Sequence, residues 1–497
     1  MRILQVASEM APIAKIGGLA DVVTGLSREI VTQGHDVTIV IPRYGVIDFS
    51  QLQYAGRTDV FDSQYNGESQ KMKVEHFLFD NAIRVCLLDT SWRKWEQASK
   101  IYSTAHEDAP SYIQFSKGVL DWLQSCQDAP YDVFHVHDWQ ASFIAGLLSP
   151  ISSFPLTFSR PRVVMTIHNL EYQGQCHFSE LEKAGYTVFH PPIEDLAHDP
   201  HHNCANLLKL GIEASDIVTT VSATYAKEIC SPDSGRGLDA VLRKKGEKFV
   251  GVLNGVDYSY WNPETDRYIP VRYSAHHSIT DVLHAKNAAR IELYQELGLE
   301  IYEGLEKRPL VASVTRLVEQ KGLSLIDSVL HRAEELDITC ILLGTAHDPK
   351  IHDRFMELNI SLRNKKRGAV LLQNSEKIAH LIFAASDLFL VPSLFEPCGL
   401  TQIIAMKYGS IPVVRRTGGL ADTVVDIDYP VFSSYVTHPN GFVFDHPDVT
   451  GIDSALHRSL QYFRKSPERW YDFIERALTQ DFSWYRSASK YLELYKG

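Results

Sequence analysis

Glu396 lies in a stretch whose residue types and spacing could do chemistry on a bound ligand. The stretch, residues 393–401, reads Ser-Leu-Phe-Glu-Pro-Cys-Gly-Leu-Thr and follows the apolar run 388–391. That run is too short for a soluble helix and is bounded by proline, which predicts a buried parallel strand. Pro397 then stiffens the loop and Gly399 permits close approach of a backbone, before a predicted helix begins. Open α/β sheets bind ligands at such loops, although a solvated glutamate in an ordinary turn is the alternative.

A glycine pair marks a second candidate site near the N-terminus. Residues 3–7 read as a strand, a helix with one apolar face follows, and residues 36–41 complete a βαβ unit. Gly17 and Gly18 stand at the start of the helix, where free N–H groups and the positive end of the helix dipole suit a phosphate. Lys15 could supply the countercharge. The alternative is a tight turn that binds no ligand.

Two further predicted strands of the N-terminal half run into polar residues. Residues 133–137 are followed by Asp138, and residues 163–167 are followed by His168. Each of these residues alone is more typical of a satisfied structural group than of a catalytic one. Together with the glycine loop, they predict one cleft at the carboxyl edge of a parallel sheet.

The C-terminal half repeats the α/β pattern, starting with a predicted strand at residues 310–314. Arg316 and Lys321 follow this strand, five residues apart, in a strand-to-helix loop. Such a pair can clamp a diphosphate, and a solvated basic turn is the alternative. Further strands at α/β spacing are predicted at residues 340–343, 370–372, 388–391 and 411–414.

We therefore predict an α/β protein with two Rossmann-like domains. The turn at Asn254 marks the boundary, so the N-terminal domain would span residues 1–253 and the C-terminal domain residues 254–478. Residues 479–497 contain aromatic residues in a helical setting and predict a final helix that packs on a domain surface.

Composition excludes several classes of partner. The chain has 497 residues, of which 49 are basic and 61 acidic, so its formal charge of −12 argues against nucleic acid or an anionic membrane. Its seven cysteines show no C-x-x-C pairing and predict neither a disulfide framework nor a zinc module, which fits a reducing cytoplasm. No export signal and no run of about 18 apolar residues is present.

Two groups of possible metal ligands are interpreted without a metal. The histidines at positions 198, 201 and 202 fall in the aperiodic stretch 174–206, and their spacing matches no compact zinc module. Asp426 and Asp428 form a D-x-D sequence that some sugar transferases use for a metal, but their loop-like neighbours favour chance. We predict no metal site.

Taken together, these stretches resemble the bacterial glycogen synthases and plant starch synthases over nearly the whole chain. The motifs that carry the resemblance are Lys-Ile-Gly-Gly-Leu, His-Asp-Trp, His-Asn-Leu, Asn-Gly-Val-Asp, Arg with Lys-Gly, Phe-Glu-Pro-Cys-Gly-Leu-Thr and Arg-Thr-Gly-Gly-Leu-Ala-Asp, at residues 15–19, 137–139, 168–170, 254–257, 316–322, 395–401 and 416–422. The resemblance implies the GT-B architecture, in which two Rossmann-like domains face each other across a cleft. It also implies transfer of glucose from ADP-glucose to the non-reducing end of glycogen or another α-1,4-glucan, with retention of configuration and without a cofactor.

The resemblance further implies roles for particular residues. Arg316, Lys321 and Lys15, with the amides of Gly17 and Gly18, would stabilise the charge that builds up on the departing diphosphate. Hinge motion near the domain boundary would close the cleft, and the terminal helix would return to the N-terminal domain.

The sugar would be oriented by a second set of residues. Glu396 would act on the glucosyl ring without becoming a nucleophile, with His168 and Asp138 on the opposite wall of the cleft. The donor site would be completed by Asn254, Asn374, Cys398, Gly399, Leu400 and Thr401.

The chain departs from the family pattern at four places. Gln140 stands where a second histidine is usual, Ile16 replaces the commoner threonine, and Asn374 falls where a tyrosine commonly lies beside the nucleotide base. A Phe-Asn-Gly-Gln acceptor segment is not recognisable between Tyr186 and Lys209. A related transferase with another donor or acceptor, and a catalytically silent glucan-binding protein, remain as alternatives. The sequence gives no indication of oligomeric state.

Overall fold

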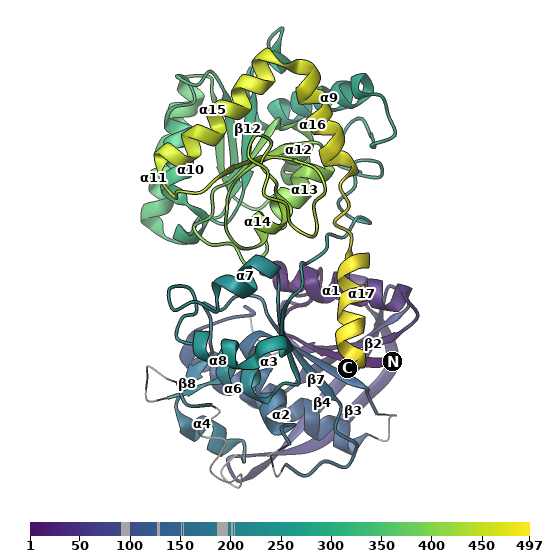
Figure 1. Ribbon diagram of the computed structural model, residues 1–497. Helices are drawn as coiled ribbons and strands as arrows, with labels where there is room; N and C mark the ends of the chain where they lie inside the picture. The colour runs from purple at the N-terminus through teal and green to yellow at the C-terminus, as the bar shows by residue number, and fades with distance from the viewer. Residues whose placement is uncertain are drawn as a thin grey trace. The chain divides into compact units, whose positions relative to one another are not determined.

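The computed structural model describes residues 1–90, 100–126, 130–150, 152, 154–185, 197–199, 202 and 204–497. It divides into two compact units, one made of Met1–Gly255 with Trp484–Gly497 and the other of Val256–Ser483. Each unit contains a sheet with helices packed on it (Figure 1), so the predicted α/β class with two Rossmann-like domains is confirmed. None of the helices in the described part of the chain has both the length and the apolar character needed to cross a bilayer.

Unit 1 is built on a nine-stranded sheet in the order β11-β10-β7-β6-β1-β2-β5-β4-β3. The strands are β1 (Arg2–Val6), β2 (Asp36–Pro42), β3 (Gln53–Tyr65), β4 (Glu68–Phe79), β5 (Ile83–Asp89), β6 (Val133–His137), β7 (Arg162–Ile167), β10 (Ile217–Thr220) and β11 (Phe249–Gly251). Strands β3, β4 and β5 pair antiparallel, and the other neighbours pair parallel. The sequence patterns did not predict this antiparallel extension.

The strand order of unit 1 reverses beside β1, because the chain moves to β2 on one side and later to β6 on the other. Both of these neighbours are parallel to β1, with Ile3 facing Val37 and Val133 in the register. The loops that follow β1 and β6 therefore leave the same edge of the sheet on either side of the reversal. In open α/β sheets this is the position where ligands bind.

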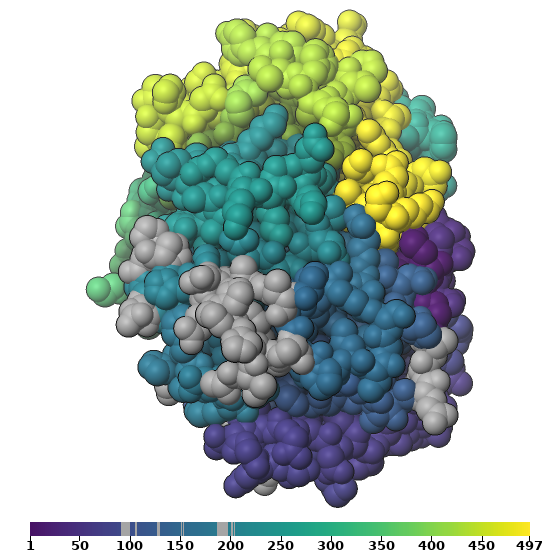
Figure 2. All heavy atoms as spheres, turned by 60° about the horizontal axis from the view of Figure 1, so that its bottom comes forward, coloured from purple at the N-terminus to yellow at the C-terminus, as the bar shows by residue number. Residues whose placement is uncertain are grey.

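Helices cover the sheet of unit 1, and the last helix of the chain is among them. They are α1 (Gly18–Thr32), α2 (Ala105–Ser125), α3 (Asp138–Leu147), α4 (Phe178–Lys183), α6 (Leu207–Ala214), α7 (Ala223–Glu228), α8 (Asp239–Lys245) and α17 (Trp484–Lys496). Two short strands, β8 (Gln175–Cys176) and β9 (Ala205–Asn206), pair antiparallel in a separate small sheet. The chain ends of unit 1 lie close together in Figure 1, and Figure 2 shows the yellow C-terminal residues against the purple N-terminal ones.

Helix α17 packs into unit 1 through aromatic residues. Trp484, Tyr491 and Tyr495 are at most 5% exposed, and the hydroxyl of Tyr495 lies 2.7 Å from Nδ1 of His135 in β6. A Cβ built on Gly25 of α1 would lie 2.1 Å from the indole nitrogen of Trp484, so a glycine is needed where the two helices meet.

Unit 2 is built on a six-stranded parallel sheet in the order β14-β13-β12-β15-β16-β17. The strands are β12 (Leu310–Val314), β13 (Thr339–Gly344), β14 (Gly368–Leu372), β15 (Leu388–Val391), β16 (Ile411–Arg415) and β17 (Phe442–Phe444). The order reverses beside β12, so the loops after β12 and β15 leave the same edge on either side of the reversal.

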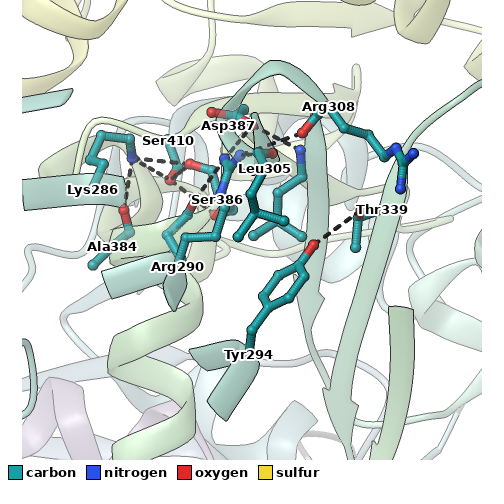
Figure 3. A network of polar contacts seen from close by, with 12 residues as sticks. Lys286, Arg290, Tyr294, Leu305, Arg308, Thr339, Ala384, Ser386, Asp387 and Ser410 are labelled. Atoms are coloured by element: carbon teal, nitrogen blue, oxygen red, sulfur yellow. Dashed lines mark hydrogen bonds and ion pairs between the residues drawn. The ribbon is translucent and has the colours of Figure 1, made fainter. Parts of the chain in front are cut away.

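One helix of unit 2, α9 (Ile279–Leu297), is anchored at the amino edge of the sheet, at the other end of the strands from the loops that follow β12 and β15. The other helices of this unit are α10 (Leu323–His331), α11 (Pro349–Asn364), α12 (Glu376–Ala385), α13 (Thr401–Lys407), α14 (Gly418–Thr423), α15 (Val449–Lys465) and α16 (Pro467–Thr479). Lys286 and Arg290 of α9 are buried and donate to groups that precede β15 and β16 (Figure 3). The guanidinium of Arg290 contacts the Asp387 carboxylate at 2.5 Å.

Candidate active site

The loops after β12 and β15 bring Lys321 and Glu396 together in unit 2. Nζ of Lys321 lies 2.5 Å from Oε2 of Glu396, and the hydroxyl of Ser393 donates to the same oxygen at 2.8 Å. Ser393 is fully buried and Glu396 is only 6% exposed. The structure thus unites a cation and a carboxylate that our sequence analysis assigned to different parts of the donor.

A second glycine pair, Gly418 and Gly419, contacts the backbone of the loop that carries Glu396. The amide of Gly419 donates to the carbonyl of Glu396 at 3.0 Å. A Cβ on Gly418 would lie 2.0 Å from the carbonyl oxygen of Glu396, and one on Gly419 would lie 2.0 Å from that of Cys398. Any side chain at either position would displace the loop, so glycine is required here by close backbone approach.

Arg415 and Gln320 also position this loop, and sequence reasoning missed both. The guanidinium of Arg415, at the end of β16, donates to the carbonyls of Ser393 and Leu394. Gln320 donates to the carbonyl of Phe395 at 3.2 Å. These bonds join residues more than 20 positions apart, and apart from the Arg-Arg pair before the glycines, no local signal pointed to them.

The remaining predicted donor residues of unit 2 are arranged around the same sheet edge. Arg316 is exposed in the loop after β12, and Asn374 is exposed just after β14. Cys398 is buried, Leu400 caps α13, and Thr401 is its first residue. No hydrogen bond among the described residues joins the side chains of Arg316 or Asn374 to Glu396.

The glycine loop of unit 1 is occupied by a buried carboxylate. Oε2 of Glu9 accepts from the amides of Ile16 at 2.6 Å and Gly17 at 2.9 Å, while its Oε1 accepts from the hydroxyl of Tyr102 at 2.6 Å. The amide of Gly17 is therefore not free, which corrects our description of this loop. The carboxylate satisfies the amides at the helix start in the way that an anion would.

Lys15 and Gly18 adjoin this carboxylate. Nζ of Lys15 pairs with Asp21 of α1 at 2.7 Å, and both side chains are more than a third exposed, so the ammonium remains accessible to a ligand. Gly18 is the first residue of α1. A Cβ on Gly17 would meet nothing within 4 Å, so the two glycine pairs, despite their similar sequences, make different contacts.

The side chain of Asp138, just after β6, fixes the backbone of His168, just after β7. Oδ1 of Asp138 accepts from the backbone amide of His168 at 2.6 Å. Asp138 has a φ of 52°, a left-handed conformation that is uncommon outside glycine and is concentrated at functional sites. Burial raises the pKa of Asp138 to about 7, and it lowers the pKa of His168 to about 3. His168 is thus neutral, and Asp138 titrates near neutral pH.

Asn254 stands at the end of unit 1 with an unused acceptor. The residue is 4% exposed, and its Oδ1 has no hydrogen-bond partner among the described residues. A buried amide oxygen without a partner is costly in the free protein, which is consistent with a ligand that donates to it.

Asp426, Asp428 and His202, which we considered as metal ligands, have other partners. Both carboxylates of Asp426 and Asp428 contact the guanidinium of Arg458, at 2.9 and 2.7 Å. His202 contacts Asp199 at 3.1 Å and is largely exposed. His201 and most of the expected acceptor segment, residues 186–196, 200 and 203, lie outside the described residues.

Comparisons with known proteins agree with the architecture of both units. The family described as starch synthase catalytic domain matches residues 2–244, and the family described as glycosyl transferases group 1 matches residues 300–477. A glycogen synthase of Protochlamydia amoebophila is 40% identical over 100% of this chain and 99% of its own. A probable starch synthase 4 of Arabidopsis thaliana is 37% identical over 99% of this chain and 46% of its own.

A solved structure is similar along the whole chain. The catalytic domain of starch synthase IV from Arabidopsis thaliana, bound to ADP and acarbose, has 36% identity and a TM-score of 0.90 over 99% of this chain and 98% of its own. The predicted GT-B architecture and the resemblance that we found in the sequence are thereby confirmed.

Proposed function

The chain belongs to the family of bacterial glycogen synthases and plant starch synthases, and from this premise we propose that it transfers glucose from ADP-glucose to the non-reducing end of an α-1,4-glucan such as glycogen, with retention of configuration. The observation that carries the proposal is full-length similarity to a glycogen synthase together with the Lys321–Glu396 pair at the strand-order reversal of unit 2. It is supported by the ADP and acarbose bound to the starch synthase relative.

The cations of unit 2 act on the leaving group. As the bond between sugar and phosphate breaks, negative charge builds up on the diphosphate, and preorganised donors lower the energy of that state. Arg316 is exposed and Lys321 is 18% exposed, so both can reach a ligand at the sheet edge. Lys15 adds a further cation in unit 1. We propose that these charges make a metal or other cofactor unnecessary.

Glu396 acts on the sugar. Its Oε2 is held by Lys321 and Ser393, which leaves Oε1 to accept from sugar hydroxyls or to face the positive charge of an oxocarbenium-like ring. The loop that carries it is fixed by backbone contacts, which preorganises the carboxylate. We assign His168 and Asp138 to the glucosyl group as well, and the backbone of residues 398–400 to its hydroxyls.

Asn374 bears on the choice of donor. An asparagine cannot supply the flat apolar contact of a tyrosine, which is worth about 1–3 kcal/mol for base stacking in nucleic-acid systems. We therefore expect a weaker preference for ADP-glucose over UDP-glucose than in tyrosine-bearing relatives. Asn374→Tyr should tighten ADP binding in isothermal titration. If it binds ADP no better than wild type, another side chain already covers the base.

The function is tested by measuring ADP release and glucan growth with purified full-length protein, ADP-glucose and glycogen. Arg316→Ala should lower turnover about 10²–10³-fold, because it removes a charge aimed at the departing diphosphate. Arg354→Ala removes an exposed arginine that pairs with Asp327 and should leave turnover unchanged. Absence of ADP release in wild type would refute transferase activity, and donor and acceptor panels would identify another substrate.

A further inference from the structure

A buried chain of hydrogen bonds reaches His168 from the interior of unit 1. The amide nitrogen of Gln5 in β1 donates to the hydroxyl of Ser27 in α1 at 2.8 Å. The side-chain oxygen of Gln5 lies 2.9 Å from Nε2 of His137 in β6, and Nδ1 of His137 lies 3.0 Å from Nε2 of His168. Gln5, Ser27 and His137 are fully buried. These hydrogen bonds link β1, α1 and β6 to the loop that follows β7.

The imidazoles of this chain are neutral. Burial lowers the pKa of His168 to about 3 and lowers that of His137 well below its ordinary value. A neutral imidazole carries a single N–H, so one ring nitrogen donates and the other accepts. Each hydrogen bond between neighbours therefore dictates the proton position in the next ring.

Gln5 sets the direction in which the hydrogen bonds of this network are donated. Its carbonyl oxygen can only accept, so Nε2 of His137 carries the proton and Nδ1 of His137 accepts. Nε2 of His168 then donates to Nδ1 of His137, which leaves Nδ1 of His168 as an acceptor. Within the part of the chain that the structure describes, no hydrogen bond uses that nitrogen, and His168 is partly exposed.

We propose that Gln5 and His137 are positioning residues that hold His168 in its Nε2–H tautomer, so that Nδ1 of His168 accepts a hydrogen bond from a hydroxyl of the donor sugar. The backbone of His168 is held at the same time by Asp138, at 2.6 Å, so the ring is fixed from two sides. The inference rests on the proposed function for the identity of the ligand. The tautomer itself is a property of the protein alone.

The tautomer is measured directly on full-length protein labelled with ¹⁵N-histidine, because protonated and unprotonated ring nitrogens give separate NMR signals. The signal of His168 is identified by its loss in His168→Gln. At neutral pH and without substrate, we expect a protonated Nε2 and an unprotonated Nδ1. The reverse assignment in the wild-type protein overturns the proposal without the need for any variant.

Gln5→Leu tests the direction of the chain. It removes the acceptor of His137, so His137 is free to protonate Nδ1 instead and to reverse the tautomer of His168. We expect His168 to shift toward the Nδ1–H form, and kcat/KM for ADP-glucose to fall about tenfold through loss of one hydrogen bond to the sugar. Retention of the Nε2–H form with wild-type kcat/KM would overturn the proposal.

Thr219→Val is the matched control. Thr219 is fully buried in the same sheet, and its hydroxyl lies 2.7 Å from that of Thr166, outside the chain that leads to His168. This variant should leave both the tautomer and kcat/KM unchanged, and a change of tautomer would contradict the assigned path. Wild-type protein with the expected tautomer but no transfer from ADP-glucose would refute the proposed function and support the tautomer assignment.

Discussion

Lys321 and Glu396 contact each other at 2.5 Å. We expect them to act on opposite charges of the donor, Lys321 on the negative diphosphate and Glu396 on the positive glucosyl ring. In the free protein each residue neutralises the other, which avoids an unpaired charge in a largely buried site. A diphosphate would compete for the ammonium, and the carboxylate would then be available to a positively charged sugar. We therefore expect the pair to couple occupation of the phosphate position to the charge that faces the sugar.

Glu396→Gln should lower turnover about 10²-fold, because an amide stabilises positive charge on the ring far less than a carboxylate does. It should not weaken ADP binding, since Lys321 loses a competing partner. Kinetics together with titration of ADP check both parts. Glu319→Gln, at an exposed position in the loop after β12, is the control. A loss of ADP affinity as large as the loss of turnover would contradict the division of roles.

Because the pKa of Asp138 is raised, we expect turnover to depend on pH. Burial raises its pKa to about 7, so it is protonated below that pH and ionised above it. The ionised carboxylate accepts more strongly from the amide of His168, so turnover should rise as pH increases through about 7. His168 does not titrate in this range, because its pKa is about 3. Asp138→Asn should lose this inflection in the pH profile, and an unchanged profile would assign the inflection to another group.

At the scale of elements, α9 is attached to the sheet of unit 2 by a buried lysine. Nζ of Lys286 donates to the carbonyls of Ala384, Ser386 and Tyr408 at 3.0 to 3.1 Å (Figure 3 shows the contacts with Ala384, Ser386 and Ser410). These acceptors precede strands β15 and β16, so the anchor lies at the amino edge of the sheet, whereas Glu396 follows the carboxyl edge. Scaffold and candidate site therefore use opposite ends of the same strands.

Lys286→Met should lower the free energy of unfolding by about 3 kcal/mol, because it keeps the aliphatic length but leaves several buried acceptors without a donor. Chemical denaturation of the purified variant measures the loss. Lys307→Met, at an exposed position in the same unit, should change stability by less than about 0.5 kcal/mol. Equal stability of the two variants would mean that other groups satisfy these carbonyls.

At the scale of the molecule, the chain enters unit 2 after Gly255 and returns to unit 1 at Trp484. Unit 1 is therefore completed only by the last residues of the chain. The contact depends on Gly25, which leaves room for the indole of Trp484 against α1. Tyr495 adds a polar contact to His135 in the sheet.

Gly25→Ala should destabilise unit 1 by about 1–3 kcal/mol despite the better helix propensity of alanine, because the new methyl group overlaps the indole of Trp484. Thermal unfolding measures the effect. Combining it with Trp484→Leu should recover part of the loss, since the smaller side chain makes room. Additive effects of the two substitutions would show that they do not meet in solution.

Local patterns were sufficient to predict much of this protein. Short apolar runs bounded by turn residues predicted the parallel strands, and polar residues at their carboxyl ends predicted Arg316, Lys321, Glu396 and His168 as loop residues. The motifs also identified the family, because their combination along the chain is specific. Such features depend on residues that are close in sequence, where periodicity and turn chemistry act directly.

Only the tertiary structure decided which of these residues meet. Lys321 contacts Glu396 because strand order places β12 beside β15, and Glu9 takes the amide of Gly17 because the loop after β1 folds back on itself. The Gln5–His137–His168 chain likewise joins three different strands or strand ends. These contacts join residues that are as many as 132 positions apart in the sequence. They follow from the order of the strands and from the packing of complementary polar groups in the interior, and neither is encoded by local periodicity.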